Sequence, residues 1–354
     1  MGGTDIGRFI MHLLLDPDDC HLEQWLVEHH QPAYRAAQVR DWLFQRRVGA
    51  VGEMTDLPKE LRAELAADFT IWVTKVRQHE QSDDGTEKLL LSLPDGGLIE
   101  CVLLRDGARR TICVSSQVGC AMGCVFCASG LDGVERNLTS GEILEQMLLL
   151  QRLLPQQERL SHIVMMGMGE PLANLDGVLA ALQVASDSAG LGISARRITI
   201  STVGLPAAID RLTRINARYQ LAVSLHAPDD ELRNRLVPVN EKVGLRMVLE
   251  AADRYFEVSG RRLTFEYVLL AGINDHREQA QRLAALLRHR PALLNLIPYN
   301  RVAGLPYSTP SAHSVAQFRR ILEDSGVTVK IRQRKGEKIN AACGQLRRSA
   351  PTGT

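Results

Sequence analysis

The chain contains 354 residues, of which 45% are hydrophobic, and its formal net charge is +1 at neutral pH. No apolar run approaches the length of a bilayer span, which excludes a membrane-spanning protein, and the near-neutral charge excludes a uniformly basic one. The odd count of seven cysteines and a start, MGGTDIGRF, without the charged and apolar regions of a signal peptide favour a protein of the reducing cytoplasm over a disulfide scaffold.

Residues 1–75 are predicted to form a helical accessory domain. The segments LEQWLVEHH, YRAAQVRDWLFQRRV and PKELRAELAADF repeat apolar residues at helical spacing. The same region carries a basic cluster that could bind phosphate groups or simply form a solvated face. The cluster consists of Arg35, Arg40, Arg46 and Arg47.

Residues 76–110 are predicted to form a β-hairpin linker region. The segment KLLLSLPDGGLIECVLL has two apolar runs on either side of Pro94, Asp95, Gly96 and Gly97, which are typical turn residues. The hairpin would join the accessory domain to the rest of the chain.

From residue 111 to residue 335 the pattern alternates between strands and helices. The predicted strands are TICVSSQ, HIVMMG, RITISTV, YQLAVSLHA, RLTFEYVLL and ALLNLIPYN. Thr139 and Glu142 match a capping box at the start of the first intervening helix, ahead of ILEQMLLLQRLL. This alternation predicts an α/β fold with a parallel sheet. Six units are too few for a closed eight-stranded barrel, which leaves an open barrel or a doubly wound sheet.

Three cysteines follow the first of these strands. Cys120, Cys124 and Cys127 stand in the run GCAMGCVFC, with gaps of three and two residues. A [4Fe–4S] cluster normally takes four thiolates, so a loop that offers three would leave one iron open to bind and activate a small molecule. Together with Cys113 the three could instead hold structural zinc, but zinc sites usually use paired C-x2-4-C units.

Polar residues follow the later strands at the positions where α/β folds bind ligands. They are Gly169 and Glu170 before Pro171, Ser201, Ser224, His226 and Asn300. A lone histidine is more often a structural one, and a lone serine often bonds only to backbone. Because all of them lie at the strand ends, together they favour an organic ligand bound beside the open iron.

Residues 336–354 are predicted to form a C-terminal tail. Its start overlaps a second basic cluster, which has one acidic member, Glu337. The basic residues are Lys330, Arg332, Arg334, Lys335, Lys338, Arg347 and Arg348. As in the N-terminal region, the cluster could bind phosphate or lie on a solvated face.

Between residues 33 and 348 the sequence resembles a known enzyme family. CAMGCVFC, with Phe126 before its last cysteine, resembles the C-x3-C-x2-C signature of radical S-adenosylmethionine enzymes. The segments CVSSQVGC, RNLTSGEI, MGMGEPLANLD, ISTVG, SLHAP and AACGQL are similar to the RlmN/Cfr family of RNA adenine methyltransferases, with the RlmN branch the nearer match.

The resemblance implies a partial (βα)6 barrel with an N-terminal helical RNA-binding domain. It also implies that Cys120, Cys124 and Cys127 hold one [4Fe–4S] cluster, whose open iron chelates S-adenosylmethionine. The residues implied in binding that cofactor are Gly169, Glu170, Ser201, Ser224, Leu225, His226 and Asn300.

The resemblance further implies a methyl-carrying cysteine, Cys343 in AACGQL. One S-adenosylmethionine methylates Cys343, and a second is cleaved to a radical that activates the new methyl group for addition to adenine. Cys113 then attacks the Cys343 sulfur, forming a disulfide as the methylated RNA leaves. Glu100 in LIECVLL stands at the family's proton-acceptor position. Cys20 and Cys101 match no motif, and we expect both to be structural.

The implied substrates are an adenosine of 23S ribosomal RNA, methylated at C2, and, as in some family members, an anticodon-loop adenosine of transfer RNA. The basic clusters would then neutralise phosphates. A low-potential donor of the flavodoxin or ferredoxin type would reduce the cluster, no membrane is involved, and a monomer suffices. Two alternatives stay open: methylation of C8, as by Cfr, and a non-catalytic RNA-binding protein stabilised by a metal. Lys338, Ser129 and Val134 depart from residues common in the family and leave the substrate detail open.

Overall fold

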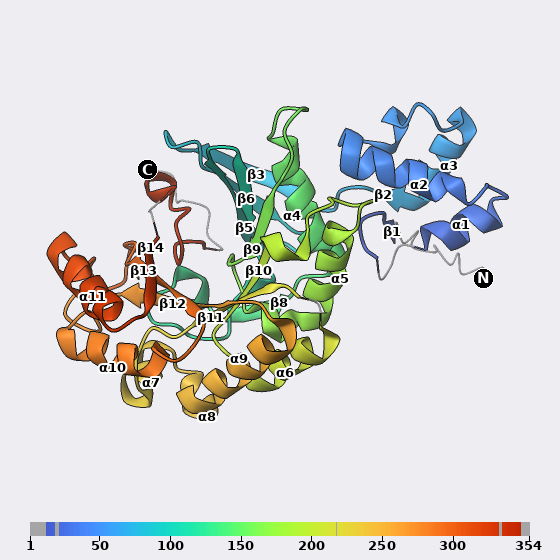
Figure 1. The fold of residues 1–354 in the computed structure, drawn as a ribbon. Helices are drawn as coiled ribbons and strands as arrows, with labels where there is room; N and C mark the ends of the chain where they lie inside the picture. Colours follow the sequence, from blue (N-terminus) through green and yellow to red (C-terminus); the bar gives the residue numbers. More distant parts are fainter. Residues whose placement is uncertain (1–11, 18–20, 217, 333–334, 348–354) are drawn as a thin grey trace, which may run out of the picture.

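The structure is a computed structural model that describes residues 12–17, 21–216, 218–332 and 335–347 (Figure 1). Cys20, Arg334 and Arg348, which the sequence analysis singled out, lie outside the described residues.

A ten-stranded mixed sheet forms the centre of the molecule. Its strand order is β14-β13-β12-β11-β10-β9-β6-β5-β4-β3. The strands are β3 (Lys75–Gln81), β4 (Glu87–Ser92), β5 (Leu98–Asp106), β6 (Arg109–Cys113), β9 (His162–Met165), β10 (Ile198–Thr202), β11 (Gln220–Ser224), β12 (Leu263–Leu269), β13 (Ala292–Pro298) and β14 (Thr328–Ile331). From β6 to β14 neighbouring strands are parallel, and from β6 to β3 they are antiparallel.

The strand order identifies the parallel part as an open barrel. Strands β6, β9, β10, β11, β12, β13 and β14 follow one another in chain order without a reversal, whereas a doubly wound sheet reverses its order at a switch point. The predicted partial barrel is therefore confirmed. All six predicted strands are present, and β14 adds an edge strand that the sequence analysis did not identify.

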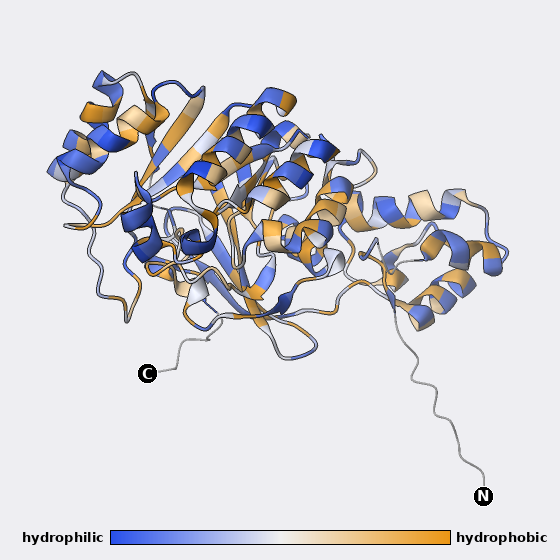
Figure 2. Cartoon of the chain, turned by 90° about the horizontal axis from the view of Figure 1, so that it is seen from below, coloured by the Kyte–Doolittle hydropathy of each residue, from blue (hydrophilic) through white to orange (hydrophobic). Residues whose placement is uncertain are grey.

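Helices cover the outer face of this sheet. They are α4 (Ser140–Arg152), α5 (Leu175–Ser186), α6 (Pro206–Ile215), α7 (Asp230–Leu236), α8 (Asn240–Val243), α9 (Leu245–Ser259), α10 (Arg277–Leu287) and α11 (Ala312–Asp324). The predicted capping box is present: Thr139 accepts the Glu142 backbone N–H at the start of α4, and the Glu142 side chain accepts the Thr139 N–H. Figure 2 shows the mixed hydropathy of the helices, which is expected of elements with one face on a core. No described helix has both the length and the apolar composition needed to span a bilayer.

The predicted N-terminal helices form a separate group on one side of the sheet (Figure 1). They are α1 (Leu22–Glu28), α2 (Tyr34–Asp41), the π-helical turn η1 (Trp42–Arg46) and α3 (Lys59–Asp68), with a short parallel pair β1 (His12–Leu13) and β2 (Phe69–Thr70). Arg47 joins this group to the barrel by donating to the carbonyls of Gln151, in the last turn of α4, and of Leu154 and Pro155 just after it. A cation is favourable there because helix carbonyls carry partial negative charge.

The predicted hairpin is formed by β4 and β5, which pair from Ser92 and Leu98 outward around the Pro94–Gly97 turn. It is more than a connection, because β5 also pairs with β6 and so extends the barrel sheet. Strand β3 was not predicted: its mostly exposed side chains carry little of the apolar alternation by which strands are identified.

Candidate functional site

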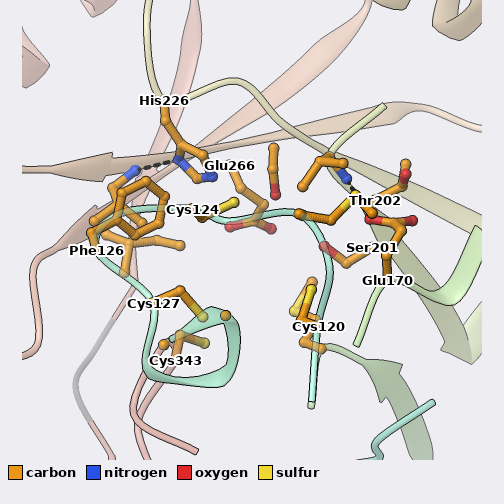
Figure 3. A pocket seen from close by; sticks show the side chains of 18 of the residues that line it. Cys120, Cys124, Phe126, Cys127, Glu170, Ser201, Thr202, His226, Glu266 and Cys343 are labelled. Carbon is orange, nitrogen blue, oxygen red and sulfur yellow. Dashed lines mark hydrogen bonds between the residues drawn. The ribbon is translucent and has the colours of Figure 1, made fainter. Parts of the chain in front are cut away.

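A cavity opens at the carboxyl ends of the parallel strands, where the sequence analysis expected a ligand (Figure 3). Its wall combines strand ends, the cysteine loop and the C-terminal tail. The predicted site residues that line it are Cys120, Cys124, Cys127, Gly169, Glu170, Ser201, Ser224, His226, Asn300 and Cys343. Of the other three predicted residues, Cys113 lines an adjoining, second cavity. Leu225 and Glu100 line neither of these two cavities.

The cysteine loop is closed at its base by two short strands. Strands β7 (Gln117–Gly119) and β8 (Val134–Asn137) pair antiparallel on either side of it. Cys120, Cys124 and Cys127 all have free thiols that border the cavity. Burial raises the pKa of Cys120 to about 12 and also raises the pKa values of Cys124 and Cys127. Three partly buried thiols from one loop would need a cationic group to ionise together.

This donor set fits an iron–sulfur cluster better than zinc. The three thiols of the loop border one cavity, and the irons of a polyatomic cluster can each take a different one, whereas a structural zinc ion needs four ligands. Cys113, the fourth sulfur of the zinc alternative, lines the adjoining cavity instead.

Glu170 is buried at the end of the loop after β9. Its carboxylate accepts the backbone N–H groups of Leu172 at 3.0 Å and Val203 at 2.8 Å. Burial raises the pKa of Glu170 to about 7, although these backbone hydrogen bonds oppose the increase. Gly169 lets the chain approach Ser116 and Gln117, because its φ is +103° and a Cβ there would lie 2.7 Å from both side chains.

His226 presents a defined tautomer to the cavity. Its Nδ1 accepts the Val268 backbone N–H at 3.0 Å, so the ring proton is on Nε2. Burial, with a smaller contribution from Arg233, lowers the pKa of His226 to about 3, which keeps the ring neutral near pH 7. The ring packs edge-on against Phe126, with centroids 4.8 Å apart (Figure 3). His226 is therefore a neutral hydrogen-bond donor that also contacts the cysteine loop.

Arg233 is a site-supporting residue that the sequence analysis missed. Its fully buried guanidinium donates to the carbonyls of Ser224 at 2.9 Å and Leu225 at 3.1 Å, which holds the end of β11 in place. The Leu225 N–H in turn donates to the Glu266 carbonyl at 3.0 Å. Leu225 is thus a buried backbone link behind the cavity wall.

Asn300 connects the strand ends to the C-terminal tail. Its Nδ2 donates to the Cys343 carbonyl at 3.1 Å, while its buried Oδ1 has no hydrogen-bond partner among the described residues. Buried polar atoms are normally hydrogen-bonded, so this oxygen indicates a polar ligand or water. Ala128 donates its N–H to the Gly344 carbonyl at 2.8 Å and joins the tail to the cysteine loop as well.

Cys343 borders both cavities, whereas Cys113, the last residue of β6, borders only the second. Burial and the nearby Cys343 thiol raise the pKa of Cys113 to about 12, and the positive charge of Arg332 opposes this increase. The second cavity therefore brings together the two cysteines that the sequence places 230 residues apart.

Glu100 lies beside the tail and is not among the residues that line the two cysteine cavities. Its carboxylate is 2.8 Å from Lys88 Nζ and accepts the Arg347 backbone N–H at 2.8 Å. Burial raises the pKa of Glu100, and the charge of Lys88 opposes the increase. Glu100 lines a separate depression with Lys88, Asn340, Gln345 and Arg347 among others.

Two further charged residues line the first cavity without having been predicted as site residues. Glu266 is a buried acid in the middle of the apolar strand β12, and that interruption of an apolar run was a usable signal. Arg332 follows β14 and was assigned to the phosphate-binding cluster, but it lines both cavities.

Several members of the two basic clusters form ion pairs with acidic side chains. Arg40 pairs with Glu23, and Arg46 with Asp41 and Asp56. In the tail cluster, Lys335 pairs with Asp106 at 3.2 Å and Lys338 with Asp83 at 2.6 Å. The acids that pair with Arg40 and Arg46 belong to the same N-terminal region, whereas Asp106 and Asp83 are far from the tail in sequence.

Comparison with known proteins matches both parts of the chain. The family described as Radical SAM superfamily matches residues 114–284, and the Ribosomal RNA large subunit methyltransferase N-terminal domain matches residues 13–71. A probable dual-specificity RNA methyltransferase RlmN of Rhodopirellula baltica is 66% identical over 328 residues, covering 93% of this chain and 88% of that protein. The protein of the same name from Streptococcus suis is 45% identical over 333 residues, covering 92% and 90%. The crystal structure of a radical SAM methyltransferase from Sphaerobacter thermophilus superimposes with a TM-score of 0.90 at 43% identity, covering 93% of this chain and 97% of that one.

Proposed function

The chain belongs to the RlmN family of radical SAM RNA methyltransferases, and from this premise we propose that it methylates C2 of an adenosine in 23S ribosomal RNA. An anticodon-loop adenosine of some transfer RNAs is the second proposed substrate. Because the proposed substrates are ribosomal and transfer RNA, the enzyme would act in the cytoplasm.

The observation that carries this proposal is the position of Cys343 between two cavities. One side of Cys343 faces the cavity of the three-cysteine loop, and the other side faces the cavity lined by Cys113. A cysteine that is methylated and activated on one side and released by a thiol on the other needs both neighbours. A non-catalytic binding protein needs neither.

The cofactor residues proposed here fit a [4Fe–4S] cluster and S-adenosylmethionine. Cys120, Cys124 and Cys127 would hold one cluster per chain, which supplies the electron that cleaves S-adenosylmethionine when a flavodoxin- or ferredoxin-type donor reduces it. The cofactor contacts would come from Gly169, Glu170, Ser201, Ser224, His226 and Asn300, with Leu225 holding the strand end behind them. Two S-adenosylmethionine molecules would be used per turnover, one of them to methylate Cys343.

The polar groups of the cavity support binding of an amino acid moiety. His226 offers its Nε2–H, Asn300 offers an unpartnered Oδ1, and Glu170 keeps acceptor capacity beyond its two backbone hydrogen bonds. An amino group and a carboxylate together need both acceptors and donors of this kind.

Glu100 is the proposed proton acceptor for the hydrogen that the adenine carbon loses. Its raised pKa brings the carboxylate nearer to neutral pH, where a general base works best. Its contact with the Arg347 N–H links it to the tail that carries Cys343.

The test is to map the methylated carbon. Anaerobically reconstituted protein is incubated with S-adenosylmethionine, reductant and unmodified ribosomal RNA fragments or transfer RNA. The digested nucleosides are separated by liquid chromatography against C2- and C8-methyladenosine standards and identified by mass spectrometry. C2-methyladenosine is expected. C8-methyladenosine would replace the proposed regiochemistry, and unmodified RNA after full cluster reconstitution would overturn the proposed function.

A further inference from the structure

Among the described residues of the two basic clusters, Arg332 is the one that lines the first cavity. It follows β14 and lines both cavities, with 28% of its side-chain surface accessible. Its Nη1 donates to the Met166 sulfur at 3.2 Å. In the second cavity it shares the wall with Cys113 and Cys343.

The charge of Arg332 is only weakly neutralised by its surroundings. Among the described residues its ion-pair partner is Glu266, whose Oε2 lies 4.0 Å from Nη1 and accepts no hydrogen bond. The other oxygen of Glu266 accepts Asn295 Nδ2 at 3.0 Å, and burial raises the pKa of Glu266, which favours its neutral form. A guanidinium without a close carboxylate is left to interact with the two thiols.

The other cations nearby do not replace it. Lys335 lines the second cavity, but its Nζ donates to the Arg105 carbonyl at 2.6 Å and pairs with Asp106 at 3.2 Å. Arg109 lies on the same strand as Cys113. Burial lowers the pKa of Arg109, and the nearby positive charge of Arg332 lowers it further. The Nε of Arg109 donates to Thr111 Oγ1 at 3.1 Å, and Arg109 is not among the residues that line the second cavity.

We propose that Arg332 is a positioning residue that stabilises the thiolate of Cys113 for its attack on the Cys343 sulfur. The inference rests on the proposed function, of which it explains one step. In that step the Cys113 thiolate forms a bond to Cys343 Sγ while the bond from Sγ to the methylene carbon breaks. The electron pair of the broken bond passes to that carbon, which takes a proton and becomes the methyl group of the RNA. Both cysteines end as a disulfide, so the two electrons that they lose are those that the carbon gains.

The electrostatics agree with this role. Burial and Cys343 raise the pKa of Cys113 to about 12, so only a small fraction is thiolate near pH 7, and Arg332 is the cation that opposes the increase. In the reverse direction, Cys343 raises the pKa of Arg332 most, with Glu266 and Cys113 adding to it against the effect of burial.

The test measures release of the covalent RNA adduct. Protein already methylated on Cys343 is reacted once with RNA, and the adduct is followed on denaturing gels in wild type, Arg332→Met, Arg332→Lys and Cys113→Ala. Arg332→Met is expected to release RNA on the order of tenfold more slowly at pH 7, corresponding to a pKa of Cys113 about one unit higher. Release should speed up by about tenfold per pH unit, because thiolate formation is then limiting. Arg332→Lys keeps the charge and should restore part of the rate.

Further variants distinguish a failure of the proposed Arg332 role from a failure of the proposed function. Arg254→Met removes a partly exposed cation that pairs with Asp210 and lines neither cavity, and it should leave release unchanged. If Cys113→Ala traps the adduct while Arg332→Met releases it at the wild-type rate, Arg332 has no such role. If no variant, including Cys113→Ala, forms an adduct, the proposed function fails instead. In that case the alkylation rate of Cys113 by iodoacetamide, compared between wild type and Arg332→Gln without RNA or cofactor, still tests the effect of the charge. Equal alkylation rates would overturn the proposed role of Arg332. The role would also be overturned if Arg332→Met bound S-adenosylmethionine more weakly but released the RNA at an unchanged rate.

Discussion

The Nδ2 atom of Asn300 lies 3.1 Å from the carbonyl oxygen of Cys343, so a residue just beyond the end of β13 holds the backbone of the proposed methyl carrier. Asn300 and Cys343 both line the two cavities. One hydrogen bond thereby connects the rigid barrel to the tail.

Removing this hydrogen bond should slow the first proposed methyl transfer. Asn300→Ala is expected to reduce the rate of Cys343 S-methylation by about 10- to 100-fold, because misplacing a reacting atom by an ångström has effects of that size. The measurement is peptide mass spectrometry after single-turnover incubation with S-adenosylmethionine. Lys338→Ala, which removes a surface ion pair of the same tail, should stay within about twofold of wild type. Equal rates in all three proteins would show that the contact does not position Cys343.

The proposed carrier role of Cys343 predicts complete loss of RNA methylation in Cys343→Ala. The matched control is Cys101→Ala, since Cys101 is also a free cysteine but is fully buried and absent from the described cavity linings. Nucleoside mass spectrometry should find no methyladenosine with the first variant and near-normal amounts with the second. Methylated RNA from Cys343→Ala would rule out the carrier mechanism.

Glu100 should matter for RNA methylation but not for methylation of Cys343. Glu100→Gln is expected to reduce product formation by about 100-fold, within the usual range for a general base, while S-methylation of Cys343 proceeds normally. Glu87→Gln alters a neighbouring buried acid that pairs with Arg105 and serves as the control. A loss of S-methylation in Glu100→Gln would instead indicate that the contact with the Arg347 N–H positions the tail.

Gly169 should not tolerate a side chain. Gly169→Ala combines a φ of +103° with contacts of 2.7 Å to Ser116 and Gln117, so we expect it to lower the free energy of unfolding by roughly 2–4 kcal/mol and to weaken S-adenosylmethionine binding. Gly192→Ala is the control because it has a φ of +65° with no atom within 4 Å, and it should cost only about 1 kcal/mol. Chemical denaturation distinguishes the two. Similar losses would mean that backbone strain alone, without crowding, sets the effect.

Glu145 should make stability depend on pH. It is fully buried on α4, its carboxylate accepts the Val73 and Thr74 N–H groups, and burial raises its pKa to about 7 from an ordinary value of 4.5. Between pH 4.5 and 7 the folded state holds a proton that the unfolded state has lost, so stability from this group falls as pH rises, by up to about 3 kcal/mol. Glu145→Gln should lack this part of the pH dependence in denaturation curves measured from pH 4.5 to 7.5. Parallel curves for the two proteins would contradict the assignment.

Local patterns identified most of the fold. The apolar runs of β9 to β13, the turn between β4 and β5 and the Thr139–Glu142 capping box depend on neighbours within a few residues, and all are present. Strand β3 was missed because an exposed edge strand lacks the apolar alternation that reveals a half-buried strand. The short strand β14 was missed beside a helix with a stronger pattern.

The sequence alone also predicted which residues carry chemistry, because spacing such as that of Cys120, Cys124 and Cys127 is a property of adjacent positions. Only the tertiary structure decided which other residues lie next to them. Cys113 and Cys343 meet at one cavity, Arg332 joins them rather than a phosphate-binding surface, and Arg40 and Arg46 are matched by acids. The physical reason is that burial and charge pairing depend on contacts between distant segments, and neither quantity is written in the residues next to a given position.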